Sequence, residues 1–230
     1  MAEAFAEAGF DFLKFNFSHN GGTVDNPIDF SDLEAFSENT YSRELEDLEI
    51  ITKLALSGIE VNGQKKSWDK LALIGHSRGG GIVILHAANS SHVSHLATWA
   101  SVADFGERFN FDMEAWKETG VTTVINGRTK QDMPHRYSFY EDFIRNEEDL
   151  TVKTAAEEID QPWLIAHGIN DESVSFDNAE RLKEWSRSAT LLPMKDGTHT
   201  FATSHPWKES ILPKPMKALV DETIGMLENE

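Results

Sequence analysis

Three residues that together support nucleophilic catalysis occur along the chain in the order Ser77, Asp171 and His199. Ser77 is flanked by glycines in the stretch GHSRG, which begins at residue 75 and matches the pattern G-x-S-x-G. A serine hydroxyl is a weak nucleophile until a histidine takes its proton and an acid orients that histidine. The three residues therefore predict attack of Ser77 on an acyl carbonyl, with His199 as the base and Asp171 as the orienting acid.

The segments on either side of Ser77 predict a sharp turn between a strand and a helix. Residues 71–74 form an unbroken apolar run, which is typical of a strand that is covered on both faces, and residues 79–89 predict a helix. Glycine is expected at positions 75 and 79 because side chains there would collide with neighbouring backbone. A serine in such a turn presents its hydroxyl at the carboxyl end of the sheet.

Asp171 and His199 also come directly after segments that predict strands, residues 162–168 and 189–194. The carboxyl ends of parallel strands meet at one edge of a sheet, which is where open α/β sheets bind their ligands. We therefore expect Asp171 and His199 to lie close to Ser77.

Other residues compete for each of these roles. Glu172 is the rival of Asp171, and His205 is the rival of His199, although His199 follows its strand more closely and comes after a glycine turn. His76 neighbours the serine but would point away from it in such a turn, so we assign it a supporting role.

The sequence shows no pattern typical of a metal or cofactor site. His167 and Asp171 are four residues apart, but they follow a predicted strand and need not share a face. We interpret His86, His92 and His95 as packed or surface residues. We therefore expect neither a metal nor a cofactor.

Along the whole chain, segments that predict strands alternate with segments that predict helices. This alternation predicts the α/β class, with a mostly parallel sheet and helices on both faces. The strands are expected at residues 10–17, 71–74, 95–103, 162–168 and 189–194, and the helices at residues 2–8, 41–57, 79–89, 176–186 and 214–230. In the second of these helices Leu45, Leu48, Ile51 and Leu54 recur at helical spacing.

Residues 104–160, called here the 104–160 segment, interrupt this alternation. Asn126-Gly127 lies between β-rich flanks and predicts a hairpin with a two-residue turn, and the acidic residues after it predict helix. Trp116, Phe139 and Tyr140 are candidates to line a substrate cleft.

The stretches GHSRGG, HGINDESV and GTHTF resemble the nucleophile, acid and histidine segments of the α/β-hydrolase superfamily. The chain is most similar to its small esterase branches and to its dienelactone-hydrolase-like or serine-aminopeptidase-like branches. The resemblance extends over residues 1–230 and implies a single domain with a lid inserted at about residues 104–160. That lid, with its hairpin, is similar to those of feruloyl-type esterases.

The resemblance also implies that strands at the start of the family's sheet are missing. One of them ends in a loop, often His-Gly, that supplies the second N–H of the oxyanion hole, and another would lie between residues 10–17 and the strand before Ser77. The backbone N–H of Arg78 remains as one expected donor. We expect either a longer protein with an internal start, a different strand pairing or a weakened enzyme, and favour the first.

Composition limits the partners. The 21 Lys and Arg residues stand against 39 Asp and Glu residues, and the resulting net charge of −18 repels nucleic acid and anionic membrane surfaces. No stretch approaches the roughly 18 apolar residues of a membrane span. The chain contains no cysteine, which excludes disulfides and fits a reducing compartment, so we expect a cytoplasmic location.

These observations favour a serine hydrolase that cleaves esters of small or medium acyl groups and takes a small-molecule ester as substrate. A peptidase of the prolyl or aminopeptidase type would use the same triad on a short peptide. The acids that would then hold its amino terminus are Glu141, Asp142, Glu147, Glu148 and Asp149, which also suit a solvated helix face. The missing oxyanion strand favours a third class, a non-catalytic binding protein. The sequence does not decide between a monomer and a homo-oligomer.

Overall fold

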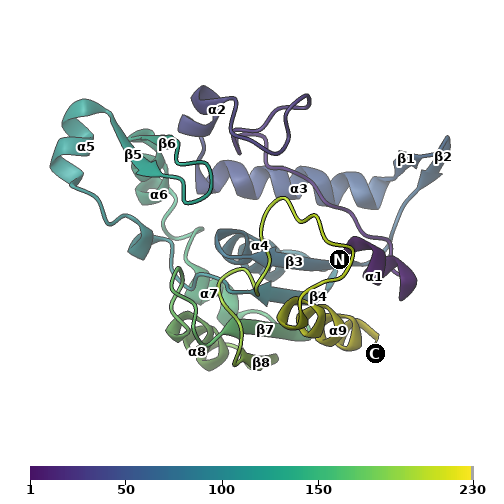
Figure 1. Ribbon diagram of the computed structural model, residues 1–230. Coiled ribbons are helices and arrows are strands. Elements are labelled where there is room, and N and C mark those ends of the chain that lie inside the picture. The colour runs from purple at the N-terminus through teal and green to yellow at the C-terminus, as the bar shows by residue number, and fades with distance from the viewer. Residues whose placement is uncertain (229–230) are drawn as a thin grey trace.

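The computed structural model describes residues 1–228, and its centre is a four-stranded parallel sheet (Figure 1). The strands lie in the order β3-β4-β7-β8, so the chain adds them from one side of the sheet to the other. Their bounds are Leu71–His76, Val93–Trp99, Trp163–Gly168 and Ala189–Met194. The strand predicted at residues 95–103 is thus β4, which begins and ends earlier than expected.

Helices cover both faces of this sheet, as predicted for the α/β class (Figure 1). One layer contains α3 (Tyr41–Ser57), α4 (Arg78–Ala88), α7 (Val152–Glu157) and α8 (Asp177–Trp185). The opposite layer contains α1 (Ala2–Glu7) and α9 (Lys214–Glu228), and the predicted residues 229–230 of the last helix lie outside the described residues.

Strand β7 shows how the two layers share the sheet. Its residues alternate between two buried clusters, with Trp163 and Ile165 in one and Leu164 and Ala166 in the other. All of its positions are buried because it has a strand on each side and helices above and below. The loop that follows β7 therefore starts from a rigid point.

Strand β3 has a different environment, because it forms the end of the sheet and pairs only with β4 within residues 1–228. Its other edge carries backbone N–H and C=O groups without a ladder partner. The exposed positions of β3 include Ala72 and His76.

The strand predicted at residues 10–17 is wrong, since this segment is irregular. Its aromatic residues pack individually: the rings of Phe12 and Phe5 lie 5.1 Å apart between centroids. Asp11 accepts hydrogen bonds from Lys66 and Trp68 instead of facing a neighbouring strand. A run of alternating phenylalanines satisfies its side chains in this way, but a strand also requires a backbone partner.

The helix predicted at residues 41–57 is confirmed as α3, which ends before Gly58, but a different face of it is buried. Of the expected apolar stripe, Leu48 is buried whereas Leu54 is 46% exposed. The buried face includes the polar residues Glu44 and Thr52. Hydrophobic periodicity missed this shift because a buried carboxylate carries no apolar signal.

The 104–160 segment forms its own group of elements beside the carboxyl edge of β3 (Figure 1). They are η1 (Gly106–Arg108), α5 (Met113–Thr119), β5 (Val121–Ile125), β6 (Asp132–Arg136), α6 (Ser138–Arg145) and α7, which packs against α4. The predicted hairpin is confirmed as β5–β6, but its turn is not the two residues Asn126-Gly127. Residues 126–131 form the connection, and the Asn126 side chain accepts hydrogen bonds from the N–H groups of Arg128 and Thr129.

Short elements occur where the sequence predicted only loops. Helix α2 (Leu33–Ser37) begins with Asp32, whose side chain accepts a hydrogen bond from the Ala35 N–H. Strands β1 (Ile59–Val61) and β2 (Gln64–Lys66) form a small hairpin after α3. Such short elements lack the length that makes periodicity informative.

Candidate active site

Ser77 lies in the turn between β3 and α4 with φ 56° and ψ −124°, a conformation that ordinary side chains seldom adopt. The backbone around it holds the turn in place: the Ser77 N–H donates to the Trp99 carbonyl at 2.9 Å, and the Ser77 carbonyl accepts from Gly80 at 2.9 Å. Strain of this kind costs on the order of 1–3 kcal/mol and persists only where the surroundings enforce it.

The glycines around Ser77 are not equivalent. A Cβ on Gly75 would overlap with the Gly79 carbonyl and with the Val83 side chain, so position 75 requires glycine. A Cβ on Gly79 would meet nothing within 4 Å, which corrects the expectation that a side chain there would collide with backbone. The close approach at this turn is instead made by Gly80, where a Cβ would overlap with Ser101.

Asp171 and His199 are joined. The Nδ1 of His199 lies 2.8 Å from the Oδ2 of Asp171, while the other carboxylate oxygen accepts from the N–H groups of Ser173 at 2.8 Å and Val174 at 2.9 Å. Burial alone would raise the pKa of Asp171, but the hydrogen bonds from Val174, His199 and Ser173 together hold this pKa below its ordinary value. Asp171 is therefore ionised and orients the imidazole.

The loops that carry Asp171 and His199 support each other directly. The Gly168 Cα lies so close to Gly197 that a Cβ on either glycine would overlap with the other. The Ile169 N–H also donates to the Met194 carbonyl at 3.0 Å. Two paired strands thus deliver the acid and the histidine to one position.

His167 is a buried residue of this site that the sequence interpretation missed. Its Nε2 lies 2.9 Å from the Val174 carbonyl and 3.4 Å from Asp171 Oδ2, so its ring braces the acid loop. Burial lowers the pKa of His167, which keeps the ring neutral. Its position as the penultimate residue of β7, before the Gly168 contact, is the sequence signal that would have found it.

His76 supports His199 from the other side. Its Nε2 lies 2.7 Å from the backbone carbonyl of His199, and the two imidazole rings are 4.7 Å apart between centroids. The side chain therefore points toward the histidine loop rather than into free space, and it links the end of β3 to that loop.

Ser77 itself is not joined to His199. The serine hydroxyl makes no hydrogen bond to any part of residues 1–228, although His76, its immediate neighbour, contacts the His199 loop. Such hydrogen bonds are often long without substrate and tighten when it binds. The structure thus assembles Asp171 with His199 and leaves Ser77 beside this pair.

Arg78, the expected oxyanion donor, begins α4. Its backbone N–H makes no hydrogen bond within the described chain, as an oxyanion donor requires. Its guanidinium has a partner that the sequence did not reveal: Nη2 lies 2.6 Å from Oε1 of Glu44, whose side chain is 2% exposed.

Two of the three candidate cleft residues are in the core. Trp116 is 1% exposed and donates from Nε1 to the His135 carbonyl at 2.9 Å, and Phe139 is 6% exposed. Their assignment as cleft residues is corrected, because a substrate would reach them only after the aromatic cluster opened. Tyr140 is half-buried against Phe109 and stays a candidate.

The rival residues lie apart from the Asp171–His199 pair. Glu172 and His205 are exposed, and neither contacts this pair. Of the acidic residues in the 104–160 segment, Glu141, Glu147, Glu148 and Asp149 are exposed, whereas Asp142 is half-buried beside Ser42.

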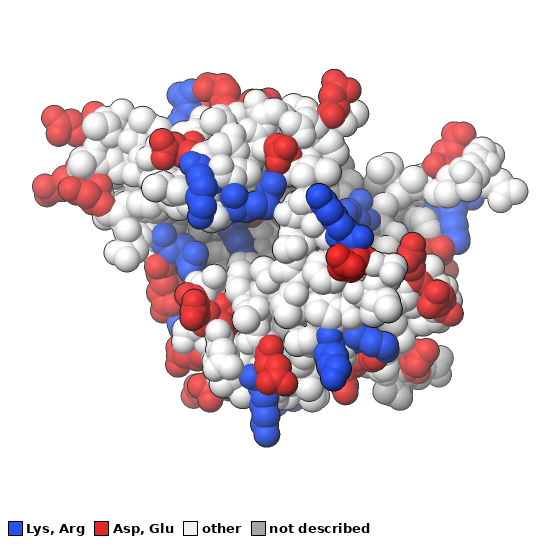
Figure 2. All heavy atoms as spheres, viewed as in Figure 1, with Lys and Arg blue, Asp and Glu red and all other residues white. Residues whose placement is uncertain are grey.

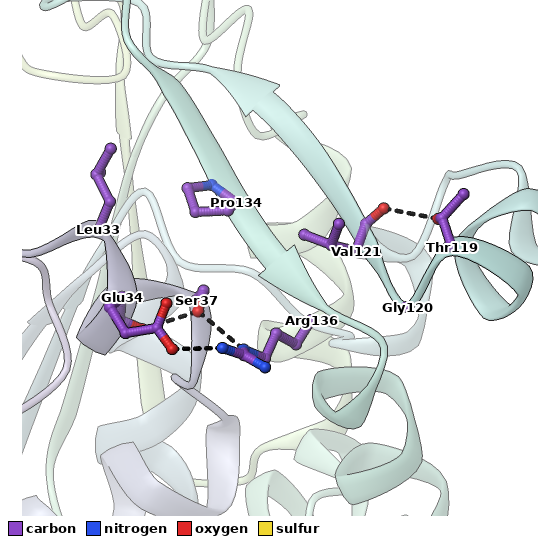
Figure 3. Close-up of a pocket in the computed structure, with 8 residues that line it drawn as sticks. All are labelled: Leu33, Glu34, Ser37, Thr119, Gly120, Val121, Pro134 and Arg136. Atoms are coloured by element: carbon purple, nitrogen blue, oxygen red, sulfur yellow. Dashed lines mark hydrogen bonds and ion pairs between the residues drawn. The ribbon is translucent and has the colours of Figure 1, made fainter.

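A cavity of about 430 Å³ lies between α2 and the β5–β6 hairpin, away from Ser77 and His199 (Figure 3). Arg136 projects from β6 toward α2, where it donates to Glu34 and to the Ser37 hydroxyl. A second cavity of about 780 Å³ lies between α3, α4 and α7. Both are separate from the candidate site.

Residues 1–228 lack the features of a metal centre and of a membrane-spanning helix. No cluster of three or more His, Asp or Glu side chains in this part of the chain has the arrangement of a metal site. No helix within it is long and apolar enough to cross a membrane.

Solved structures share this fold. The chain matches one of the metagenome-derived lipolytic enzymes LipS and LipT over 100% of its own length and 86% of that chain, with a TM-score of 0.69 and 14% identity. It matches a putative hydrolase from Agrobacterium vitis with a TM-score of 0.61 and 20% identity, over 84% of this chain and 71% of that one.

Est1E from Butyrivibrio proteoclasticus, also solved with ferulic acid bound, matches with a TM-score of 0.58 and 15% identity, over 82% of this chain and 71% of that chain. No protein-family model and no curated protein matches the sequence. The expected resemblance is confirmed at the level of architecture: the chain has the α/β-hydrolase fold.

Proposed function

We propose that the protein is a serine hydrolase that cleaves carboxylic esters of small or medium acyl groups. The observation that carries this proposal is the strained Ser77 turn at the same sheet edge as the hydrogen-bonded Asp171–His199 pair. Fold alone does not assign an activity, whereas this arrangement supplies a nucleophile, a base and an orienting acid.

In the first half-reaction, Ser77 Oγ attacks the ester carbonyl carbon while His199 Nε2 takes the hydroxyl proton. The carbonyl oxygen becomes an oxyanion, which accepts a hydrogen bond from the Arg78 N–H. The carbon–oxygen bond to the alcohol then breaks, and His199 returns its proton to the leaving alkoxide. The product is an acyl-enzyme on Ser77.

In the second half-reaction, water attacks the acyl carbon after giving its proton to His199, and the bond to Ser77 Oγ breaks as the serine regains a proton. Asp171 stabilises the imidazolium in both steps and stays ionised, as its lowered pKa requires. The chemistry needs only water as a co-reactant.

We also propose that the 104–160 segment acts as the lid of this site. It lies beside the carboxyl edge of β3 (Figure 1), and its hairpin is tied to the α2 region by the ion pairs of Arg128 with Asp29 and of Arg136 with Glu34. Tyr140 is the candidate that contacts substrate from this side.

A peptidase with the same triad is the nearest alternative. A peptidase would need the acidic residues of the 104–160 segment to hold the amino terminus of its substrate. Most of these residues are exposed to solvent, which favours an esterase. Est1E, which shares this fold, binds ferulic acid, a small aromatic carboxylic acid, and this supports a small-molecule substrate over a peptide.

The test compares p-nitrophenyl butyrate with alanine p-nitroanilide, using the wild type, Ser77→Ala and the exposed-serine control Ser210→Ala. Ester cleavage that Ser77→Ala abolishes and Ser210→Ala retains supports the proposal. Faster cleavage of the anilide supports the peptidase. Equal rates for wild type and Ser77→Ala would support a non-catalytic binding protein, the class that the open edge of β3 favours.

A further inference from the structure

Arg78 follows Ser77 directly in the chain, and its guanidinium is held by one residue, Glu44. Glu44, from α3, contacts Nη2 at 2.6 Å, and Asn39 donates to the same Glu44 oxygen at 2.7 Å. Both Glu44 and Asn39 are buried, at 1% and 4% exposure. The Arg78 side chain is therefore fixed in direction by a buried support.

Most of the hydrogen-bonding capacity of Arg78 is unused. A guanidinium has five N–H donors in a planar fork and stays charged at every physiological pH. Within residues 1–228 the only partner of the Arg78 guanidinium is Glu44, and 37% of the Arg78 side chain is exposed. The remaining N–H donors of the Arg78 guanidinium are therefore free to bind an acceptor group of a ligand.

Both positive and negative side chains lie in the region of Arg78. The positive ones include Arg78 itself and Arg108. Burial raises the pKa of Tyr41. The charges of Arg78 and Arg108 act against this rise, and those of Glu44 and Asp104 add to it, so all four act on the same phenol. Asp104 lies 3.8 Å from a guanidinium nitrogen of Arg181, which offsets its charge.

His135 of β6 faces the same region from the 104–160 segment. Burial, together with the charge of Arg78, lowers the pKa of His135 to about 4. The ring is therefore neutral at neutral pH, stacks on Phe139 at 5.6 Å between centroids and makes no side-chain hydrogen bond within the described residues. Arg78 is the cation in this place, and the neutral His135 ring belongs to the aromatic cluster, where it also packs against Phe36 at 5.2 Å between centroids.

The surface view agrees with this arrangement. Figure 2 shows a hollow below α2, next to the carboxyl end of β3 in Figure 1, with Lys and Arg side chains at its rim and inside it. Elsewhere on this face Asp and Glu side chains are scattered among uncharged ones, together with a few further Lys and Arg side chains. This protein of net charge −18 thus has a locally basic hollow on this face.

We propose that Arg78 binds a carboxylate carried by the ester substrate, so that the enzyme prefers anionic esters. This inference rests on the proposed function. Carboxylates match the planar fork of arginine with two parallel hydrogen bonds, which neutral groups do not. A carboxylate on the free edge lies closer to the guanidinium than to Glu44, so attraction exceeds repulsion. Since Arg78 follows Ser77 directly, their Cα atoms are only about 3.8 Å apart.

The experiment compares two matched pairs of esters. The first pair, mono(4-nitrophenyl) glutarate and 4-nitrophenyl butyrate, places the carboxylate in the acyl part. The second pair, 4-acetoxybenzoate and phenyl acetate, places it in the alcohol part. The measured quantity is the ratio of kcat/KM for the anionic ester to kcat/KM for the neutral one in each pair.

In the wild type we expect a ratio above one in at least one pair, and that pair identifies which part of the substrate carries the charge. Arg78→Gln retains the backbone N–H and should lower this ratio about 10- to 100-fold, as expected for the loss of a charged bidentate contact. The exposed-arginine control Arg145→Gln should leave the ratio unchanged. A ratio in Arg78→Gln equal to that of the wild type would overturn the inference.

A binding measurement separates failure of this inference from failure of the proposed function. Mono(4-nitrophenyl) glutarate is titrated into Ser77→Ala and into Ser77→Ala combined with Arg78→Gln, where turnover plays no part. A dissociation constant at least tenfold higher in the double variant supports carboxylate recognition. Equal constants refute it, even if Ser77 proves to be the nucleophile.

Discussion

The candidate site has an enclosed side, which carries the acid and the histidine, and an open side, which carries the serine. The two sides differ in how many contacts hold their residues. The acid and the histidine follow β7 and β8, which pair with each other, and the Gly168–Gly197 contact locks their loops together. Ser77 follows β3, the end strand, whose neighbour on one side is β4 and whose other edge has no strand within residues 1–228. The enclosed side is assembled, whereas the serine on the open side makes no side-chain hydrogen bond.

This difference shows that the strained turn at Ser77 can form without a hydrogen bond between Ser77 and His199. The Ser77 conformation depends on contacts inside β3, β4 and α4, and these are complete. The Ser77 hydroxyl, in contrast, has no hydrogen-bonding partner within residues 1–228, and catalytic hydrogen bonds of this kind often tighten only when substrate binds.

Asp171→Asn should have the largest effect, because it removes the charge from the assembled side. The asparagine holds the imidazole in the wrong tautomer, and we expect ester hydrolysis to fall by about 10⁴-fold. Initial rates with p-nitrophenyl butyrate provide the measurement. The neighbouring variant Glu172→Gln should retain activity, and equal losses in both variants would contradict the assignment of the acid.

Gly75→Ala should destabilise the serine side by roughly 1–3 kcal/mol or more, since its Cβ has no room beside the Gly79 carbonyl and Val83. Urea unfolding gives the free energy of unfolding. The control Gly79→Ala lies in open space at the start of α4 and should be neutral or stabilising. If both variants behaved alike, the tight packing of the turn would be disproved.

His135→Gln should flatten the pH dependence of stability. His135 has a pKa of about 4 in the folded protein against an ordinary 6.5, so the unfolded chain binds more protons between these values. The wild type therefore loses stability as pH falls through this window, by about 2 kcal/mol between pH 7.5 and pH 5. In urea titrations the variant should lack this contribution of His135, and the exposed control His205→Gln should keep it. The other histidines with lowered pKa values, which are His76, His86 and His167, contribute equally in both proteins.

Ala72→Lys should have the smallest effect on folding, roughly 0.5 kcal/mol or less, because Ala72 is exposed on β3. A lysine on an open edge discourages pairing with another chain. Light scattering at rising concentration should show self-association of the wild type and less of the variant. Identical, monomeric behaviour of both proteins would mean that the edge is already protected.

The sequence predicted the enclosed side more completely than the open side. The four strands of the sheet and the residues after β3, β7 and β8 followed from apolar runs and from glycine positions, which report burial and turns directly. The strand at residues 10–17 was wrong, because alternating phenylalanines report side-chain burial and carry no information on whether a backbone partner exists.

The buried contacts of Arg78 and His167 were out of reach of the sequence for a related reason. Glu44 and Asn39 lie in a polar stretch that resembles an exposed helix start, and only the tertiary structure places them behind Arg78. His167 is a polar residue in an apolar strand, and its partner, the Val174 carbonyl, is a backbone group. Trp116 and Phe139 were assigned to a cleft because aromatic composition does not distinguish a core from a binding surface.

Labelling with a fluorophosphonate, which reacts with activated serines, tests whether Ser77 is a nucleophile activated by His199. Peptide mass spectrometry of the labelled protein locates the adduct, with His199→Ala and the rival variant His205→Ala as comparisons. We predict a single adduct on Ser77 in the wild type and in His205→Ala, and none in His199→Ala. Folded wild-type protein without an adduct on Ser77 would contradict the account.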